Sequence, residues 1–157
     1  MRSRTWTIIA VALTLVGARV DFLGAQEAPP AEYLGYETVE MAIDAGPFES
    51  DTIRPSAGNV LIAARFRTSE GSLAMDSVRV IDPAGAEYVP IGVGMFSIDN
   101  FSDTSGVSGA VMTLPSGIEI WLYYEVPSPG DGLDRWTIAV GDRDPVPLEV
   151  SPEGPSE

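Results

Sequence analysis

The segment IEIWLYYEVP, residues 118–127, combines aromatic, aliphatic and acidic side chains in one short run that ends at a proline. Its apolar side chains recur at every second position, which is the period of a β-strand with one buried face. The even positions form an uninterrupted apolar row, which consists of Ile118, Ile120, Leu122, Tyr124 and Val126. We therefore expect a strand whose even side chains enter the core and whose odd side chains lie on the outer face.

Two aromatic side chains, Trp121 and Tyr123, occupy odd positions of this strand between two glutamates. On the outer face they either lie flat over small neighbouring side chains or form a contact surface for a partner. Packing over small neighbours is the simpler interpretation, and partner binding is the alternative. Arg79, on a strand that could flank them, could stack its guanidinium group on one ring. The candidate partner-binding residues are therefore Trp121, Tyr123 and Arg79.

A second apolar run, LDRWTIAV at residues 133–140, follows after the loop PSPGDG. Its apolar row consists of Trp136, Ile138 and Val140. The proline and glycine residues of the loop favour a turn, so we predict an antiparallel hairpin of the two strands. Both apolar rows face the core only in every second register. The register with the best outer pairs places Glu125 opposite Arg135, Trp121 opposite Ala139, and Tyr123 opposite Thr137.

From residue 34 onwards the chain is a succession of short apolar runs separated by clusters of Gly, Pro, Asp and Ser. In one run the apolar row Val39, Met41 and Ile43 is expected to face the core. The tetrapeptide DPAG at residues 82–85 has the composition of a type I turn. Alternation predicts further strands within residues 36–44, 59–68 and 76–82. The expected inner rows of the last two are Val60, Ile62, Ala64 and Phe66, and Val78 and Val80. We conclude that the fold is all-β, an antiparallel β-sandwich of about seven or eight strands, with a closed barrel as the alternative.

The N-terminal segment has the composition of an export signal. Arginines precede an apolar stretch that is short for a membrane span and suits a secretory signal. Cleavage is expected after Ala25 or after Ala18, and a retained N-terminal anchor is the alternative. The predicted organisation is a signal peptide at 1–25, a flexible linker at 26–33, a β-sandwich domain at 34–150 and a disordered tail at 151–157. The protein is therefore expected to be exported, either periplasmic or secreted.

The chain of 157 residues contains no cysteine, no histidine and no lysine, and all nine basic residues are arginine. This composition excludes metal and haem sites with Cys or His ligands, Ser-His-Asp and Cys-His catalysis, and lysine Schiff bases. We expect no cofactor. After residue 25 the chain carries 22 acidic residues and six arginines, a net charge of −16. That charge opposes binding to phosphate backbones and anionic membranes, so nucleic acid is not an expected partner. Because the short apolar stretch belongs to the predicted signal peptide, we expect no transmembrane segment in the mature chain.

Two acidic pairs are weak candidates for calcium binding: Asp131 with Asp134, and Asp142 with Asp144. In the predicted hairpin the pairs lie at opposite ends of the last strand, about 25 Å apart at ~3.4 Å per residue, so they cannot form one site. Solvated acids in turns are the simpler interpretation. Paired carboxylates for glycoside hydrolysis are also a poor fit, because the two glutamates of the 118–127 strand lie about 20 Å apart.

The segments VRVIDPAGAEYVP and LPSGIEIWLYYEVPSPGDGLDRWTIAVGDRDPVPLEV carry a resemblance that covers roughly residues 34–150. Their features are a D-x-x-G-x-x-Y hairpin at Asp82, Gly85 and Tyr88 and a strand that ends in xEVP. In these features the chain resembles a family of exported bacterial immunoglobulin-like domains of unknown function, which is similar in fold to secreted mycobacterial immunogenic antigens. The resemblance implies export and an immunoglobulin-like β-sandwich, and it implies no catalytic residue.

These observations predict a non-enzymatic exported β-sandwich domain that binds or scaffolds an unknown protein partner at the cell envelope. The alternative is a calcium- or carbohydrate-binding module that uses acidic loops and outer-face aromatic residues. A hydrolase with carboxylates assembled from loops is the third hypothesis.

Overall fold

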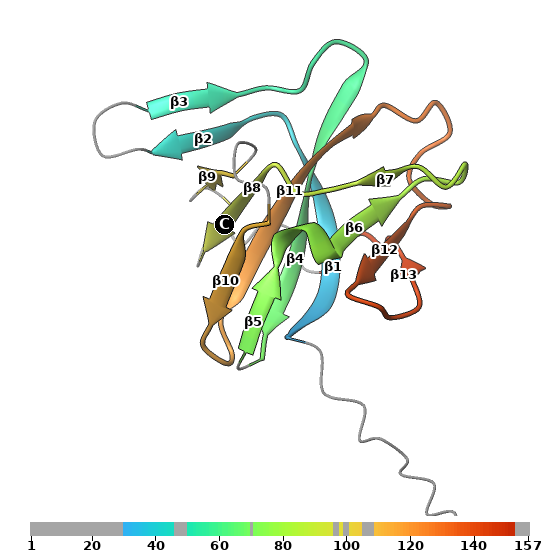
Figure 1. Cartoon of the computed structure of the whole chain (residues 1–157). Helices are drawn as coiled ribbons and strands as arrows, with labels where there is room; N and C mark the ends of the chain where they lie inside the picture. Colours follow the sequence, from blue (N-terminus) through green and yellow to red (C-terminus); the bar gives the residue numbers. More distant parts are fainter. Residues whose placement is uncertain are drawn as a thin grey trace, which may run out of the picture.

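A computed structural model of the protein describes residues 30–45, 50–69, 71–95, 98, 101–104 and 109–152 (Figure 1). Within these residues the chain is all-β apart from one 3₁₀ turn, η1 (Met75–Ser77). The largest sheet has seven strands in the order β1 (Ala31–Val39), β4 (Asn59–Thr68), β11 (Glu119–Pro127), β8 (Gly92–Met95), β9 (Phe101–Asp103), β2 (Ala42–Ala45) and β3 (Ser50–Ile53). A four-stranded sheet has the order β13 (Val146–Pro147), β12 (Thr137–Val140), β6 (Val78–Ile81) and β7 (Glu87–Tyr88). A two-stranded sheet pairs β10 (Val111–Leu114) with β5 (Gly71–Ala74).

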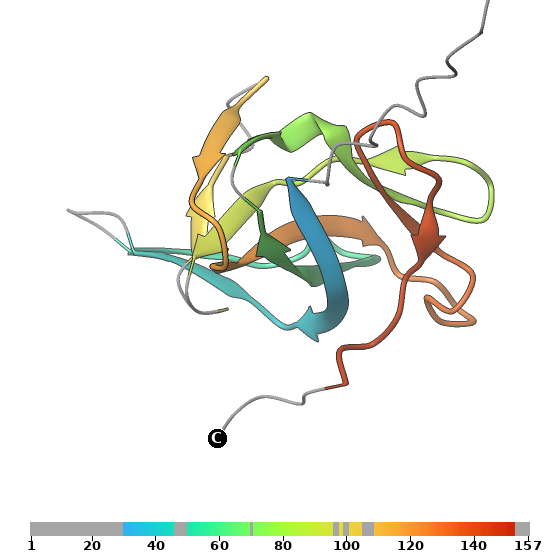
Figure 2. The same cartoon turned by 90° about the horizontal axis from the view of Figure 1, so that it is seen from below.

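The main core lies between the seven-stranded sheet and the two smaller sheets, which together form a second layer (Figure 2). The even side chains of β4 and β11 enter this core from one layer: Ile62, Ala64, Phe66, Ile120, Leu122, Tyr124 and Val126. The second layer contributes Leu73, Val78, Val80, Leu114, Trp136 and Ile138. The apolar rows predicted for these strands are therefore confirmed. Two layers of largely antiparallel strands around one core are consistent with a β-sandwich.

Strand β11 is buried on both faces, which the alternation of its sequence did not indicate. A second, smaller core covers its odd face and contains Ala42, Leu61, Ala63, Phe101, Trp121 and Tyr123. Trp121 is 8% exposed and Tyr123 is 1% exposed. The prediction of an exposed outer row on this strand is therefore wrong. The covering residues come from β2 and β9, which extend the same sheet beyond β8.

The predicted hairpin between residues 118–127 and 133–140 is also wrong. β11 pairs with β4 and β8 in one sheet, whereas β12 pairs with β6 and β13 in the other. Both strands turn their even rows toward the same core from opposite layers, so alternation fits packing across the core as well as pairing within a sheet. The residues between β11 and β12 therefore carry the chain from one layer to the other.

None of the outer pairs predicted for that hairpin register is present. Trp121 lies opposite Arg65 and Gly94, and Tyr123 lies opposite Ala63 and Gly92. Thr137 and Ala139 instead lie opposite residues of β6, namely Ile81 and Arg79. The side chain of Glu125 accepts hydrogen bonds from Ser56 and Asn59, and Arg135 pairs with Asp131.

The run 36–44 is divided between two strands, because β1 ends at Val39 and β2 begins at Ala42. This break resets the alternation, so Ala42 is buried while Met41 and Ile43 are 41% and 47% exposed. The expectation that the latter two face the core is wrong. They lie on the β2–β3 hairpin, which projects from the left of the molecule in Figures 1 and 2.

Both ends of the sandwich extend past their predicted boundaries. β1 begins at Ala31, which is 1% exposed, so the last three residues of the 26–33 linker belong to the sheet. Ser151, at the start of the predicted tail, is buried and donates its backbone N–H to the Tyr36 carbonyl. The predicted signal peptide lies outside the described residues. No helix among the described residues is long and apolar enough to cross a membrane.

A bulge at Gly35 brings β1 against the C-terminal segment that follows β13. The register of β1 with β4 shifts between Tyr33 and Gly35, and Gly35 has a φ of 136°. Beyond the bulge, Tyr36 forms a parallel bridge with Val150. A Cβ atom on Gly35 would lie 2.7 Å from the Ser151 Cα atom, so only glycine allows the two backbones to approach this closely.

The predicted turn at residues 82–85 is present between β6 and β7. The Gly85 N–H donates to the Asp82 carbonyl at 3.0 Å. The Asp82 carboxylate accepts hydrogen bonds from the backbone N–H groups of Ala84 and Ala86, each at 2.8 Å. This local capping by an aspartate is the reason the turn was recognisable from the sequence.

Candidate functional site

The predicted contact residues Trp121 and Tyr123 lie under a cover formed by the same chain. The Tyr123 hydroxyl donates to the Ile98 carbonyl, and the Tyr123 ring meets the Phe101 ring edge-on, with centroids 4.8 Å apart. A Cβ atom on Gly92 would overlap the Phe101 ring, so the ring needs the bare backbone of β8. We call this outer face of the seven-stranded sheet, together with its second core, the covered face.

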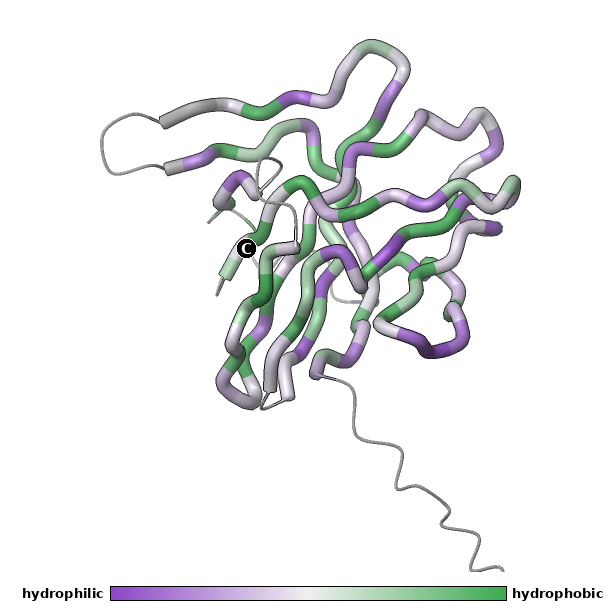
Figure 3. The backbone as a smooth tube through the Cα atoms, in the orientation of Figure 1, coloured by the Kyte–Doolittle hydropathy of each residue, from purple (hydrophilic) through white to green (hydrophobic). Residues whose placement is uncertain are grey.

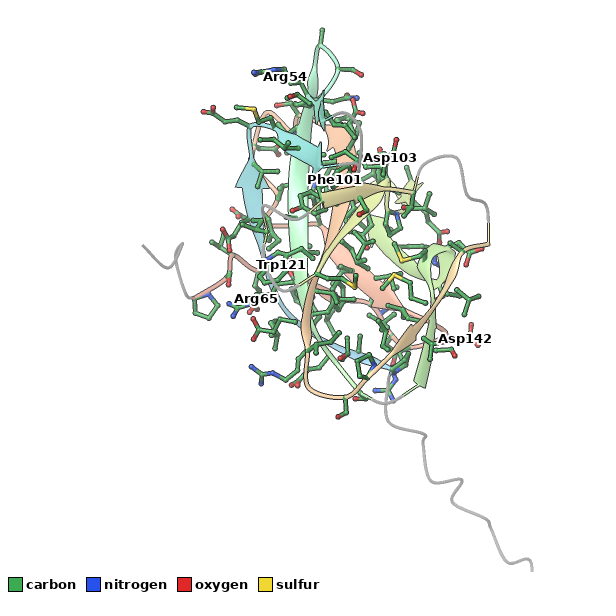
Figure 4. All side chains as sticks on the ribbon, turned by 90° about the vertical axis from the view of Figure 1, so that its left-hand side faces the viewer. Arg54, Arg65, Phe101, Asp103, Trp121 and Asp142 are labelled. Carbon is green, nitrogen blue, oxygen red and sulfur yellow. The ribbon has the colours of Figure 1, made fainter. Side chains whose placement is uncertain are left out.

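An arginine does stack on one of these rings, but it is Arg65 and not Arg79. The Arg65 guanidinium carbon lies 5.8 Å from the centroid of the Trp121 ring (Figure 4). An arginine therefore stacks on an outer-face ring of β11, as expected, but it comes from β4 instead of β6. The Trp121 Nε1–H is buried and has no acceptor within the described part of the chain.

The two glutamates of β11 are held in separate hydrogen-bond networks. Arg65 donates to Glu119 at 2.6 Å and Arg67 at 3.3 Å, and these bonds lower the pKa of the Glu119 carboxyl. Hydrogen bonds from Asn59 and Ser56 lower the pKa of Glu125 in the same way. Both carboxylates therefore stay ionised at neutral pH, and neither is poised to donate a proton.

The calcium candidates do not form a metal site in the described part of the structure. Asp131 makes an ion pair with Arg135 at 2.7 Å. Asp134 also precedes β12, whereas Asp142 and Asp144 follow it. Nowhere among the described residues do three or more acidic side chains gather closely enough to hold a metal ion.

A shallow hollow of about 580 Å³ lies at the ends of β5 and β10. It is lined by Gly71, Ser72, Thr113, Leu114, Pro115 and Ser116. The lining contains hydroxyl groups but no aromatic ring on which a sugar could stack, and no charged side chain. The hollow therefore lacks the convergent groups of a ligand site.

The outer face of the four-stranded sheet is different, because neither core includes its residues. Since Val78, Val80 and Ile138 point into the main core, alternation directs their neighbours outward. One row across the sheet is Glu87, Ile81, Thr137 and Pro147, and the next contains Arg79 and Ala139. Val89, which follows β7, is 51% exposed. We call this surface the neutral face and define it as Arg79, Ile81, Glu87, Val89, Thr137 and Pro147. Ala139 lies among them but is only 2% exposed.

The charges of the neutral face cancel. Its two ionic side chains, Arg79 and Glu87, form a salt bridge at 3.0 Å and are 33% and 49% exposed. The remaining side chains are apolar or carry a single hydroxyl. The sheet thus presents a surface of no net charge in a chain whose net charge is −14.

Acidic side chains border one end of this face. The Gly141 N–H donates to the Ser77 carbonyl at 2.9 Å, which joins the start of β6 to the turn after β12. Exposed aspartates stand beside both bonded residues and at the end of the turn, and Figure 3 shows this turn between β12 and β13 as strongly hydrophilic. We call these residues, Asp76, Asp142 and Asp144, the acidic rim. Two predicted calcium candidates, Asp142 and Asp144, therefore follow the strand that pairs with the strand of Arg79, which is the one predicted partner-binding residue that is not buried.

Sequence reasoning identified Arg79 but missed Ile81, Val89 and Pro147. The signal was present for Ile81, because it shares the parity of Arg79 in a strand whose inner row was recognised. The other two lie in very short strands or just beyond them, where alternation cannot be followed. A two-residue strand gives no periodic signal.

Within the described residues, the fold and the neutral face define an all-β protein of two packed layers with a partly exposed sheet face of no net charge. Comparison of the chain with models of protein families, with curated proteins and with solved structures gave no match.

Proposed function

We propose that the protein is a non-enzymatic, exported module with an immunoglobulin-like sandwich, and that it binds a protein partner at the cell envelope through the neutral face. The observation that carries this proposal is the exposed, charge-balanced face of the four-stranded sheet in a strongly acidic chain. A contiguous surface without net charge on a soluble protein favours contact with another macromolecule.

The strand order supports the immunoglobulin-like part of the proposal. The strands β1, β4, β6, β7, β8, β11, β12 and β13 correspond in chain order to A, B, C, C′, D, E, F and G. The two main sheets then contain the runs A-B-E-D and G-F-C-C′, which are the strand orders of immunoglobulin sandwiches with a C′ strand. The crossing from β11 to β12 corresponds to the E–F connection between the two sheets.

A binding role fits the chemistry of the side chains better than catalysis. The chain lacks His, Cys and Lys, and the two carboxylates with a lowered pKa are already engaged by arginine, asparagine and a backbone N–H. The neutral face spans four strands, which lie about 4.8 Å apart with about 3.4 Å per residue along each strand. It therefore covers a few hundred Å², the size of a typical functional patch on a monomer.

The test compares two double variants of matched composition. Val89→Gln with Thr137→Gln alters the neutral face, whereas Val111→Gln with Thr113→Gln makes the same changes on exposed positions of β10. Each purified protein is cross-linked in an extract of the cell envelope, and the captured proteins are quantified. We expect the wild type and the β10 variant to capture equal amounts of the same partner. The neutral-face variant should capture about tenfold less of it. Equal capture by both variants at equal melting temperature would overturn the proposal.

A further inference from the structure

The acidic rim and the neutral face lie on the same sheet, and together they specify the chemistry of a partner. The rim adjoins the β6 and β12 end of the face through the Gly141–Ser77 hydrogen bond. Its three aspartates are exposed and make no salt bridge within the described part of the chain. A partner that extends past the apolar rows in this direction therefore meets three exposed aspartates, which outnumber the one arginine of the turn after β12, Arg143.

A second copy of the chain is a poor occupant of this surface. A two-fold interface presents the same patch from both sides, so each copy would bring its own acidic rim. The net charge of −14 on each chain adds a long-range repulsion. Like charges brought together at an interface disfavour association, and Arg79 on the neutral face is already paired with Glu87.

A segment with the opposite charge is the complementary occupant. The apolar area is small for a stable interface, which buries about 800 Å² on each partner, so contacts at the rim would add substantially to binding. Lysine and arginine side chains at the border of an apolar segment would supply them.

We propose that the neutral face and the acidic rim together bind a cationic polypeptide segment of a partner protein. In this arrangement apolar side chains of the partner lie against Ile81, Val89 and Thr137, and its basic side chains pair with the acidic rim. This inference rests on the proposed function, and it names the partner by its charge and amphipathic pattern.

The first experiment measures binding of synthetic peptides to the purified protein by fluorescence anisotropy at low and high salt. The probes are a peptide of alternating lysine and valine, a peptide of alternating glutamate and valine, and a peptide of alternating lysine and serine. We expect the lysine–valine peptide to bind tightest and to weaken as salt rises. Equal binding of the lysine–serine peptide, or tighter binding of the glutamate–valine peptide, would overturn the proposal.

Two triple variants then separate the rim from net charge. Asp76→Asn, Asp142→Asn and Asp144→Asn remove the rim. Glu32→Gln, Glu37→Gln and Glu40→Gln remove the same charge from β1 and the residue that follows it. We expect the rim variant to bind the lysine–valine peptide about tenfold more weakly, which is the combined loss of three solvent-screened ion pairs. We expect the β1 variant to stay close to the wild type, and an equal loss in both variants would overturn the proposal.

Envelope capture distinguishes the failure of this inference from the failure of the proposed function. If the neutral-face variant loses a captured partner but the rim variant retains it, the proposed function stands and the cationic partner is excluded. If neither variant changes capture, the proposed function fails as well. A wild-type dimer in sedimentation that dissociates in the neutral-face variant would make the occupant a second copy and would also overturn the inference.

Discussion

On the outer face of the seven-stranded sheet, two large rings lie beside glycine and alanine, and the chain's own strand β9 closes over them. On the outer face of the four-stranded sheet, small and β-branched side chains lie beside one ion pair, and neither core extends over them. Both surfaces arise from the same two-residue alternation. The difference lies in the rest of the chain, which supplies β2 and β9 to one sheet and no equivalent cover to the other.

This contrast divides the two surfaces by role. On the covered face, Trp121, Tyr123 and Phe101 are at most 8% exposed, so their contribution is to the free energy of folding. The neutral face lies outside both cores, and its Val89 and Glu87 side chains are 51% and 49% exposed. Substitutions on the two faces should therefore have opposite consequences, with losses of stability on the first and losses of binding on the second.

The largest expected effect is on the covered face. Tyr123→Ala removes a ring that is 1% exposed together with its hydrogen bond to the Ile98 carbonyl. We expect it to lower the free energy of unfolding by about 3–5 kcal/mol. Val89→Ala on the neutral face removes atoms from a side chain that is 51% exposed, and we expect a change within about 0.5 kcal/mol. Urea unfolding of both variants measures the difference, and equal stability would mean that the ring is not part of a core.

A smaller effect is expected where the backbone itself is covered. Gly92→Ala places a methyl group against the Phe101 ring, and this overpacking should cost about 1–3 kcal/mol. Gly130→Ala is the matched control, because no atom lies within 4 Å of a Cβ at that position and its φ is not in the left-handed region. The control should be neutral or slightly stabilising. Thermal unfolding of the two variants measures this difference in stability. A Gly92→Ala variant as stable as the wild type would show that the Phe101 ring has room to move.

The all-β fold and the inner rows of the strands followed from the sequence because burial on one face imposes a strict period of two. The rows of residues 118–126 and 59–68 are correct for this reason. Turn chemistry was equally readable at Asp82, where a carboxylate caps its own turn. These features depend on residues close together in the chain.

Strand pairing and the covered face could not be predicted in the same way. Tyr123 meets Ala63 and Gly92, each far away in the sequence, and the predicted neighbours Thr137 and Ala139 satisfied the same preference for small side chains. Likewise, Arg65 and Arg79 both alternate outward on their strands, and nothing local shows which one reaches Trp121. The neutral face was missed because its exposure depends on where the rest of the chain packs, which no local pattern of residues indicates.

Acid should weaken the ion pair between Glu119 and Arg65, which stacks on the Trp121 ring of the covered face. The pKa of Glu119 is lowered from 4.5 mainly by its hydrogen bond with Arg65. A carboxyl with a lower pKa in the folded state contributes stability above pH 4.5, and this contribution is lost as the pH falls through the folded value. Glu119→Gln should therefore lower the free energy of unfolding by about 0.5–1 kcal/mol at neutral pH. It should also flatten the pH dependence of this free energy below pH 4.5. A variant with the same acid profile as the wild type would contradict this account.

The smallest effect is expected for the ion pair on the neutral face. Arg79 and Glu87 are more exposed than Arg65 and Glu119, which are 18% and 27% exposed, so water screens their attraction more strongly. Glu87→Gln should change the free energy of unfolding by less than about 0.5 kcal/mol. It would nevertheless leave the Arg79 charge uncompensated on the neutral face. The same variant should therefore weaken capture of a cationic segment while the urea midpoint stays within error, and a loss of stability as large as that of Glu119→Gln would mean that the two faces are equally protected from solvent.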